Sequence, residues 1–177
     1  MLFRSKYGII YDAVLFRRLE RTLPELLRLE AKGMAHIVAR SCQIKAKVVE
    51  QDERESGLRA ILNYGHTIGH ALEAISHYGK YLHGEAISIG QVAASRISRD
   101  VLGLGQAEVN RIETLFEKAG LPTSVCLAKP HLARVFAAMK LDKKVSGGEV
   151  KFVLARKIGQ VEFGIDVPKA IIKAVLK

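Results

Sequence analysis

The sequence predicts a mainly α-helical fold with one small β-hairpin near its C-terminus. Apolar residues recur every three or four positions through most of the chain, which is typical of amphipathic helices. Ala, Leu, Ile, Arg, Lys and Glu dominate, whereas aromatic residues make up only 6% of the 177 residues, and this balance favours helices. After Gly148 the pattern changes to two β-rich runs around a short turn, which indicates the hairpin.

The boundaries of these elements follow from the residues that start and stop helices. Pro24 marks either a break or the first turn of a new helix capped by Thr22. Gly120 followed by Pro122 is a typical helix stop. The predicted helices cover residues 12–31, 34–51, 59–76, 84–102, 106–119 and 129–140, the hairpin strands cover 150–155 and 160–167, and a last helix starts at Pro168.

Two of these helices are expected to pack closely. Gly65 and Gly69 interrupt the helix predicted over 59–76, and a glycine inside a helix costs about 1 kcal/mol relative to alanine. We therefore expect another group to lie against this backbone, and we assign the space to a cofactor or substrate. The helix predicted over 84–102 carries small and apolar residues all round, which is typical of a buried helix.

Composition and charge indicate a globular domain with a basic surface. Apolar residues make up 49% and charged residues 26% of the chain, so we expect residues 1–177 to form a single helical domain. The formal net charge is +10. The basic residues are spread along the chain without a zinc-finger spacing, an RNA-binding aromatic motif or a long Lys/Arg block. A basic surface can bind nucleic acid, an anionic membrane or an anionic small substrate, and the missing motifs disfavour nucleic acid.

The sequence also favours the cytoplasm. Cys42 and Cys126 are far apart and form no CxxC motif, so we expect them to pack as small hydrophobic residues rather than to form a disulfide. No apolar run approaches the roughly 18 residues of a membrane-spanning helix. The start MLFRSKYGIIYD lacks the apolar core and cleavage site of a signal peptide.

Histidines cluster in the stretch RAILNYGHTIGHALE, residues 59–73. His66 and His70 are four residues apart, so on a helix they share one face. Asn63 and Glu73 extend the same stripe, as does Arg59 one turn earlier. A polar stripe between apolar positions predicts a wet cleft lined on one side by this helix.

Two histidines one helical turn apart can bind a divalent metal ion. His83, in the sequence HGE, could supply a third ligand from the start of the next helix. The alternative is that His66 and His70 are surface residues or hydrogen-bonded core residues. The two flanking glycines and the HGE sequence favour a metal site. The remaining histidines lack such neighbours and are interpreted as structural: His36, His77 and His131.

Several cations have no evident carboxylate partner in the sequence. Lys45 lies 14 residues before Arg59, and Lys143 and Lys144 precede the hairpin. Such cations can bind a phosphate or a carboxylate of a substrate. The alternative is that the lysines are simply exposed to solvent.

Long strings of this sequence resemble 3-dehydroquinate synthase, a family within the sugar phosphate cyclases. The strings are GLRAILNYGHTIGHALEA and YLHGEAISIG around the histidines, with SKYGIIYDAVLFRRLE, CQIKAKVVEQDERESGLRA and MKLDKKVSGGEVKFVLARKIGQVE in matching order and spacing. The resemblance covers nearly the whole chain and implies the helical C-terminal domain of that family.

This resemblance implies a reaction and roles for individual residues. The family converts a phosphorylated seven-carbon sugar acid of the shikimate pathway to 3-dehydroquinate, with loss of phosphate, using NAD and a divalent metal, usually Zn²⁺ or Co²⁺. It is usually a homodimer. The implied roles are His66 and His83 as metal ligands, His70 as a substrate and proton contact, and Lys6, Lys45, Arg59, Asn63 and Lys143, in preference to Lys144, as substrate-binding residues.

The sequence also departs from the family. The third metal ligand of the family is a glutamate, and the corresponding position here is Phe3. The glycine-rich NAD-binding half of the family is not in this sequence. We therefore expect water or a partner chain to complete the metal shell, and we expect the isolated chain to be inactive without a separate N-terminal NAD-binding chain.

Two other interpretations stay open. The chain could belong to another sugar phosphate cyclase, such as 2-deoxy-scyllo-inosose synthase, although Arg59, Lys45 and the lysine of the DKK sequence suit a carboxylated substrate better. It could also be a non-catalytic helical module, either a truncated remnant or a basic binding protein. An intact set of site residues from Arg59 to His83 argues against a remnant.

Overall fold

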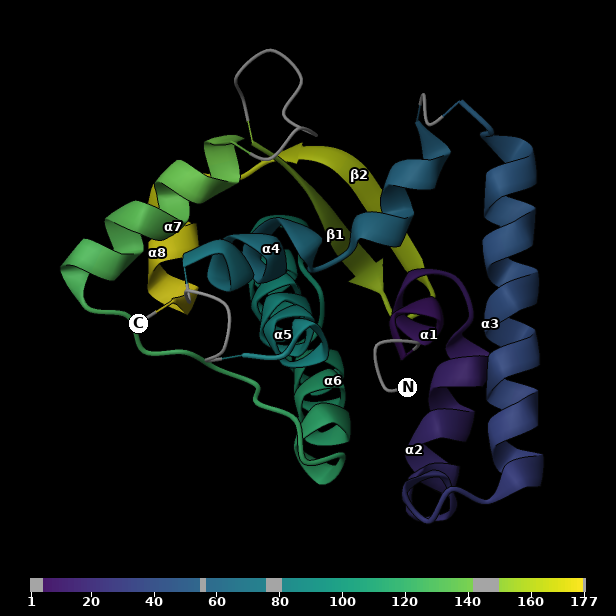
Figure 1. Ribbon diagram of the computed structural model, residues 1–177. Helices are drawn as coiled ribbons and strands as arrows, with labels where there is room; N and C mark the ends of the chain where they lie inside the picture. The colour runs from purple at the N-terminus through teal and green to yellow at the C-terminus, as the bar shows by residue number, and fades with distance from the viewer. Residues whose placement is uncertain (1–4, 55–56, 76–80, 142–149, 177) are drawn as a thin grey trace.

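A computed structural model describes residues 5–54, 57–75, 81–141 and 150–176. It confirms a mainly helical fold with one two-stranded antiparallel sheet near the C-terminus (Figure 1). The elements are α1 (Lys6–Ile10), α2 (Ala13–Leu27), α3 (Ala31–Gln51), the 3₁₀ helix η2 (Leu58–Asn63), α4 (His66–Ile75), α5 (His83–Leu102), α6 (Gln106–Lys118), α7 (Lys129–Leu141), β1 (Lys151–Lys157), β2 (Gln160–Asp166) and α8 (Lys169–Val175).

Helix α5 is the centre of this arrangement. It packs against α4, α6, α8 and β1, while α2 and α3 stand side by side at one end of the molecule and α7 and α8 lie at the other (Figure 1). Every residue from Ala86 to Ser95 in α5 is buried. The expected buried helix is therefore confirmed, and it has the small and apolar composition that close packing on several sides requires.

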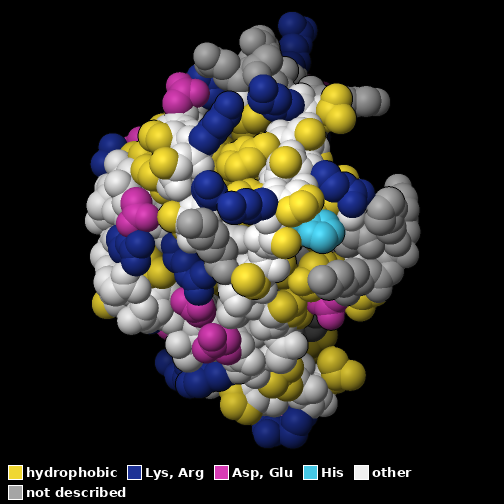
Figure 2. All heavy atoms as spheres, turned by 90° about the vertical axis from the view of Figure 1, so that its left-hand side faces the viewer, with side chains coloured by type: hydrophobic (Ala, Val, Ile, Leu, Met, Phe, Trp, Pro, Cys, Tyr) yellow, Lys and Arg dark blue, Asp and Glu magenta, His cyan; other side chains and the backbone are white. Residues whose placement is uncertain are grey.

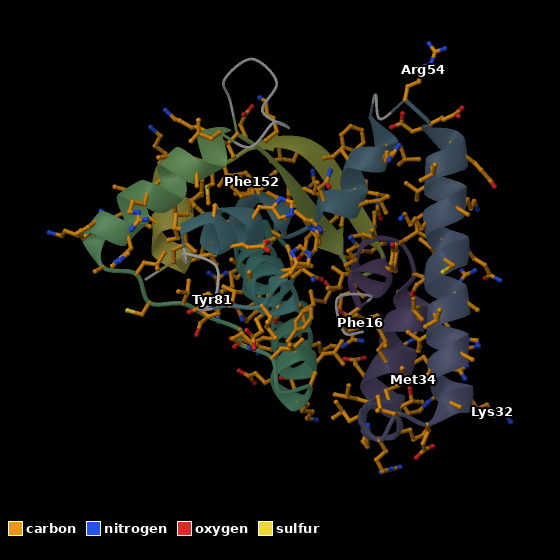
Figure 3. The ribbon with its side chains drawn as sticks, viewed as in Figure 1. Phe16, Lys32, Met34, Arg54, Tyr81 and Phe152 are labelled. Atoms are coloured by element: carbon orange, nitrogen blue, oxygen red, sulfur yellow. The ribbon has the colours of Figure 1, made fainter. Side chains whose placement is uncertain are left out.

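Strand β1 links two groups of buried apolar side chains. Phe152, labelled in Figure 3, and Leu154 belong to one group, and Val153 and Ala155 belong to the other. Successive side chains of a strand point to opposite faces, so the continuous apolar run of β1 is buried on both faces. Helix α5 also contributes residues to both groups, and the two elements together join the ends of the molecule.

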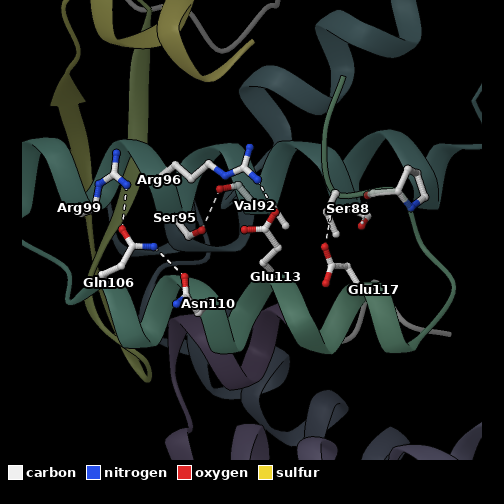
Figure 4. A network of polar contacts seen from close by, with 11 residues as sticks. Ser88, Val92, Ser95, Arg96, Arg99, Gln106, Asn110, Glu113 and Glu117 are labelled. Atoms are coloured by element: carbon white, nitrogen blue, oxygen red, sulfur yellow. Dashed lines mark hydrogen bonds and ion pairs between the residues drawn. The ribbon is translucent and has the colours of Figure 1, made fainter. Parts of the chain in front are cut away.

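A row of polar contacts attaches α6 to the outer side of α5 (Figure 4). Arg96 forms an ion pair with Glu113. Arg99 Nη1 donates to Gln106 Oε1 at 2.8 Å, and Gln106 Nε2 donates to Asn110 Oδ1 at 2.7 Å. These side chains are satisfied by one another along the α5–α6 interface, which fixes the register of α6 on the buried central helix.

The helix predicted over 12–31 is shorter and unbroken. It runs as α2 from Ala13 to Leu27 with Pro24 inside, so the expected break is wrong. Thr22 does not cap a new helix, because its hydroxyl donates to the carbonyl oxygen of Arg18 at 2.9 Å. Pro24 removes one backbone donor close to the helix end, and the buried apolar face keeps this segment helical. The short helix α1 was not predicted.

The helix predicted over 59–76 is two elements. The 3₁₀ helix η2 ends at Asn63, and α4 begins at His66 after a sharp change of direction at Gly65, whose φ is +78°. This left-handed conformation favours glycine. The prediction of a single helical stripe from Arg59 to Glu73 is therefore wrong, because these residues lie on two consecutive elements.

The hairpin and the cysteines differ in detail from expectation. Strand β1 extends two residues closer to the turn than predicted, whereas β2 begins at residue 160 as predicted, so that Lys157 pairs with Gln160 and Gly159 takes a φ of +94°. The last helix begins at Lys169, one residue after Pro168. Cys42 and Cys126 form no disulfide, as expected, but both are exposed, so the prediction that they are packed is wrong. The turn predicted at Gly147–Gly148 lies outside the described residues.

Lys and Arg side chains are spread over the molecular surface. On the face shown in Figure 2 they stand among apolar side chains at many places and do not form one block. Lys32 and Arg54, near the two ends of α3, point away from the body of the protein (Figure 3). Among the described helices, none has the length and apolar character needed to cross a membrane.

Asp12 caps α2 and links it to α3. Its Oδ1 accepts hydrogen bonds from the backbone N–H of Val14 at 3.0 Å and of Leu15 at 2.9 Å. Arg40 Nε donates to Oδ2 at 2.7 Å. Burial opposes ionisation of this carboxyl, but the hydrogen bonds from Leu15 and Arg40 outweigh it and hold the pKa of Asp12 below its usual range.

Replacing Asp12 should therefore destabilise the protein in a pH-dependent way. At pH 7 we expect Asp12→Ala to lower the free energy of unfolding by about 1–2 kcal/mol, because a cap and an ion pair are lost. A lowered folded-state pKa gives stability that is present above the unfolded pKa of about 3.9 and lost as pH falls through the folded value. Urea unfolding of wild type and variant at pH 7 and at pH 3 measures both effects.

The matched control is Asp166→Ala, which removes a more exposed carboxylate paired with Lys151 on the hairpin. We expect this change to stay within about 0.5 kcal/mol at both pH values. An Asp12→Ala deficit that is the same at pH 3 and pH 7 would contradict the pKa argument.

Candidate metal and substrate site

Three histidine rings converge where α4 meets the start of α5. The ring centre of His66 lies 5.1 Å from that of His70 and 6.4 Å from that of His83. The rings of His70 and His83 are 6.0 Å apart. The structure thus brings together the three histidines that the sequence pattern selected, and it does so from two helices. His36 and His131, by contrast, are exposed on α3 and α7, and His77 lies outside the described residues.

The hydrogen bonds of His66 and His83 fix which ring nitrogen carries the proton. His66 Nδ1 lies 3.1 Å from the carbonyl oxygen of Tyr64, and His83 Nδ1 lies 3.0 Å from Glu73 Oε2. A carbonyl and an ionised carboxylate can only accept, so Nδ1 is the donor in both rings. In this tautomer the lone pair of a neutral imidazole is on Nε2, which is the atom that can bind a metal ion.

Close helix packing holds these rings at their separation. A Cβ atom added at Gly65 would lie 2.6 Å from Gln91, and one at Gly69 would lie 2.7 Å from Ile87. Both contacts are with α5. The prediction that another group lies against the two glycines is therefore confirmed, but the group is α5 and not a cofactor or substrate. The glycines act on the site indirectly, because they let the helix of His83 approach the helix of His66.

The Arg59 segment is organised by a buried carboxylate. Asp52 is 7% exposed, and its Oδ2 accepts from the backbone N–H groups of Gly57 and Arg59, both at 2.8 Å. Arg59 Nη1 donates to the carbonyl oxygen of Glu53 at 3.1 Å. Asp52 therefore closes the loop between α3 and η2 and sets the backbone position from which the Arg59 side chain departs.

Lys6 joins α1 to the same segment. It is 9% exposed, and its Nζ donates to the carbonyl oxygen of Leu62 at 2.9 Å, next to the half-buried Asn63. Lys45 is exposed on α3, which packs against η2, but the described contacts do not connect it to Lys6 or to the histidines. Lys143, Lys144 and Phe3 lie outside the described residues.

Two contributions to this site were missed at the level of sequence. Asp52 was treated as part of a polar loop, although Asp side chains commonly accept hydrogen bonds from backbone N–H groups that follow in the chain. Glu73 was placed on the polar stripe without a role. Its spacing, three residues after His70, could not indicate that it would contact His83 across the α4–α5 interface.

The donor set fits part of a metal shell. Two imidazoles that bind one zinc ion through Nε2, with Zn–N of about 2.1 Å, place their ring centres about 5–6 Å apart. The 6.4 Å between the ring centres of His66 and His83 is longer than that spacing, so the two rings would have to move closer together to share one ion. Within the described ranges no group of three His, Cys, Asp or Glu side chains is arranged to hold an ion. These two nitrogens therefore fill two positions, and further ligands would come from outside this group.

The fold is that of a helical domain of the sugar phosphate cyclase type. The structure matches 2-epi-5-epi-valiolone synthase from Streptomyces hygroscopicus, solved with NAD⁺ and Zn²⁺ bound, with a TM-score of 0.84 and 25% identity over 98% of this chain and 48% of that one. A family model described as 3-dehydroquinate synthase C-terminal matches residues 5–145. The chain belongs to this family.

Individual relatives agree with this assignment. The chain is 47% identical over 174 residues to 3-dehydroquinate synthase of Gloeobacter violaceus, covering 97% of this chain and 47% of the relative. It is 44% identical over 171 residues to that of Nitrosospira multiformis, covering 97% and 46%. A 2-deoxy-scyllo-inosose synthase solved with carbaglucose-6-phosphate, NAD⁺ and Co²⁺ shares the fold, with a TM-score of 0.67 and 24% identity over 81% of this chain and 41% of that one. The chain thus spans about half the length of the curated relatives it matches.

Proposed function

We propose that this chain is the metal- and substrate-binding half of a 3-dehydroquinate synthase. In this proposal it acts in the shikimate pathway on a phosphorylated seven-carbon sugar acid, which is cyclised with loss of phosphate. The convergence of the rings of His66, His70 and His83 is the observation that carries the proposal. Family membership and the identity to the curated relatives support the choice of reaction.

His66 and His83 would hold Zn²⁺ or Co²⁺, and the bound ion would polarise hydroxyl and carbonyl oxygens of the substrate. Of the two matched cyclase structures, one was solved with Zn²⁺ bound and the other with Co²⁺. The ring centre of His70 lies 5.1 Å from that of His66 and 6.0 Å from that of His83, and this proximity supports a role for His70 in exchanging a proton with the substrate.

The cationic residues would bind the two anionic groups of the substrate. Arg59 and Asn63 lie on η2, and Lys6 contacts η2 through Leu62. Arginine binds carboxylate and phosphate through paired hydrogen bonds, and lysine binds them as a point charge. Lys45 and Lys143 are assigned to the same substrate on the basis of the family resemblance.

NAD would supply the redox chemistry of the reaction. The sheet in the described part of the chain is a two-stranded antiparallel hairpin, which lacks the strand–turn–helix needed for a dinucleotide. These residues therefore do not fit NAD, and we assign its binding to an N-terminal half like that of the full-length relatives. That half would belong to a longer form of this polypeptide or to a separate chain, and we propose a cytoplasmic homodimer as the working assembly.

Reconstitution tests this function. Residues 5–177 would be fused behind the N-terminal half of the Gloeobacter violaceus relative, and phosphate release from the seven-carbon substrate would be measured with NAD and Zn²⁺. We expect the fusion to release phosphate and residues 1–177 alone to release none. In the fusion, Arg59→Ala should lower kcat/KM by about ten- to a hundredfold, because a charge-assisted hydrogen bond contributes about 1.5–3 kcal/mol.

The matched control is Arg54→Ala, which removes an arginine of the loop before η2 whose side chain points away from the body of the protein (Figure 3). It should leave kcat/KM unchanged. A folded fusion that binds NAD and zinc but releases no phosphate would contradict the proposed reaction. Phosphate release by residues 1–177 alone would contradict the need for an NAD-binding half.

A further inference from the structure

Glu73 occupies a specific place beside the candidate metal site. It lies on α4, one turn after His70, and reaches across to the first residue of α5, where its Oε2 is 3.0 Å from His83 Nδ1. The carboxylate therefore contacts the ring nitrogen that faces away from the proposed metal position. Because an ionised carboxylate can only accept, this contact favours the tautomer of His83 that carries its proton on Nδ1.

The contact between Glu73 and His83 is too exposed to contribute much to folding stability. The side chain of His83 is 53% exposed and that of Glu73 is 37% exposed. Ion pairs this exposed contribute little to folding stability, because water screens the charges and the side chains lose entropy. A role in stability is therefore a poor explanation for the contact, and a role in orienting His83 remains.

A comparison with His66 supports the orienting role. His66 Nδ1 is held by the backbone carbonyl of Tyr64, two residues away, so its tautomer is set by the local chain. His83 is the first residue of α5, and about half of its side chain is exposed. Its orientation therefore depends on a side chain from another helix. Ligating histidines that donate their second nitrogen to a carboxylate are better ordered and more basic.

We propose that Glu73 is the positioning residue for the metal ligand His83. It keeps the proton on Nδ1 and turns Nε2 toward the ion shared with His66. This proposal rests on the metal site of the proposed function, but it concerns a residue to which that function assigns no role. It predicts that Glu73 affects metal affinity and the His83 tautomer far more than it affects folding.

Metal titration of the 177-residue chain tests this role. Zn²⁺ affinity would be measured by competition with a chromophoric chelator for wild type, Glu73→Ala and Glu73→Gln. We expect Glu73→Ala to weaken binding about ten- to a hundredfold, and Glu73→Gln to weaken it less than tenfold, because the amide oxygen can still accept from Nδ1. Thermal unfolding of the apo proteins should be nearly the same. Glu50→Ala, an exposed change on α3, should alter neither quantity.

A second readout reports the proposed orientation directly. Nitrogen NMR of the apo protein above pH 8 should show His83 protonated at Nδ1 in wild type and mainly at Nε2 in Glu73→Ala. Wild-type zinc affinity and an unchanged tautomer in Glu73→Ala would overturn the positioning role and leave the metal site intact. If wild type itself binds no zinc, the metal site fails, and the role of Glu73 fails with it.

Discussion

Gly90→Ala is expected to lower the free energy of unfolding by at least about 3 kcal/mol, which places it among the most destabilising single changes in this chain. A Cβ atom at this position would meet the carbonyl oxygen of Gly65 directly and would lie 2.8 Å from the backbone nitrogen of Gly69. These are backbone atoms of α4 and of the residue before it. They cannot rotate away as a side chain could, so the two helices would have to separate.

The same change should damage the candidate site. Gly90 lies where α5 crosses Gly65 and α4, and α5 carries His83 while α4 carries His66 and His70. Any separation of the helices would also move the histidine rings apart. We therefore expect Gly90→Ala to lose metal affinity together with stability.

Gly84→Ala is the matched control, since it changes another glycine of α5. An added Cβ there has no neighbour within 4 Å among the described atoms. Alanine is the better helix former by about 1 kcal/mol, so this variant should be as stable as wild type or slightly more stable. Urea unfolding followed by circular dichroism measures both variants. Equal midpoints for Gly90→Ala and Gly84→Ala would contradict the packing argument.

His66→Ala is expected to abolish stoichiometric zinc binding while leaving the fold intact. The variant removes one of the two Nε2 atoms that the structure prepares for a metal, and a single imidazole with water binds zinc weakly. His66 is partly exposed at the start of α4, so alanine there, the best helix former, has a small effect on folding. Zinc content after dialysis, measured by atomic absorption, should fall from about one per chain to near zero.

His131→Ala is the control for this measurement. His131 is exposed on α7, and its removal should leave the zinc content unchanged. Equal zinc content in His66→Ala and wild type would show that the metal is held elsewhere. An unfolded His66→Ala variant would instead point to a structural role for this histidine, in conflict with its partial exposure.

The histidine residues of the site could be selected from the sequence because their chemistry is local. The spacing of four residues between His66 and His70 places both on one face of any helix that contains them, and α4 is such a helix. His83 could be added because HGE begins a helix in the pattern, and α5 does begin there. The role of Glu73 could not be predicted, because its partner lies ten residues away on another helix.

The ends of the helices were harder to predict where the backbone turns although apolar residues continue at helical spacing. Apolar residues continue through Gly65 with helical spacing, and the pattern therefore predicts one helix. The chain turns at Gly65 because glycine tolerates its φ of +78° and because α5 needs the space that a side chain would occupy. The first of these reasons is local, but the second depends on a contact with Gln91, which the pattern of apolar residues cannot predict.

Sequence alone thus specified the mainly helical fold, the C-terminal hairpin, the buried character of α5 and the three histidines of the candidate site. All of these depend on residue type and on periodicity over short distances. Only the tertiary structure showed that α5 packs against Gly65 and Gly69, that Asp52 accepts a hydrogen bond from the backbone of Arg59 and that Glu73 contacts His83. Each of these contacts joins residues that tertiary packing brings together. Local sequence patterns do not predict which helices pack against each other.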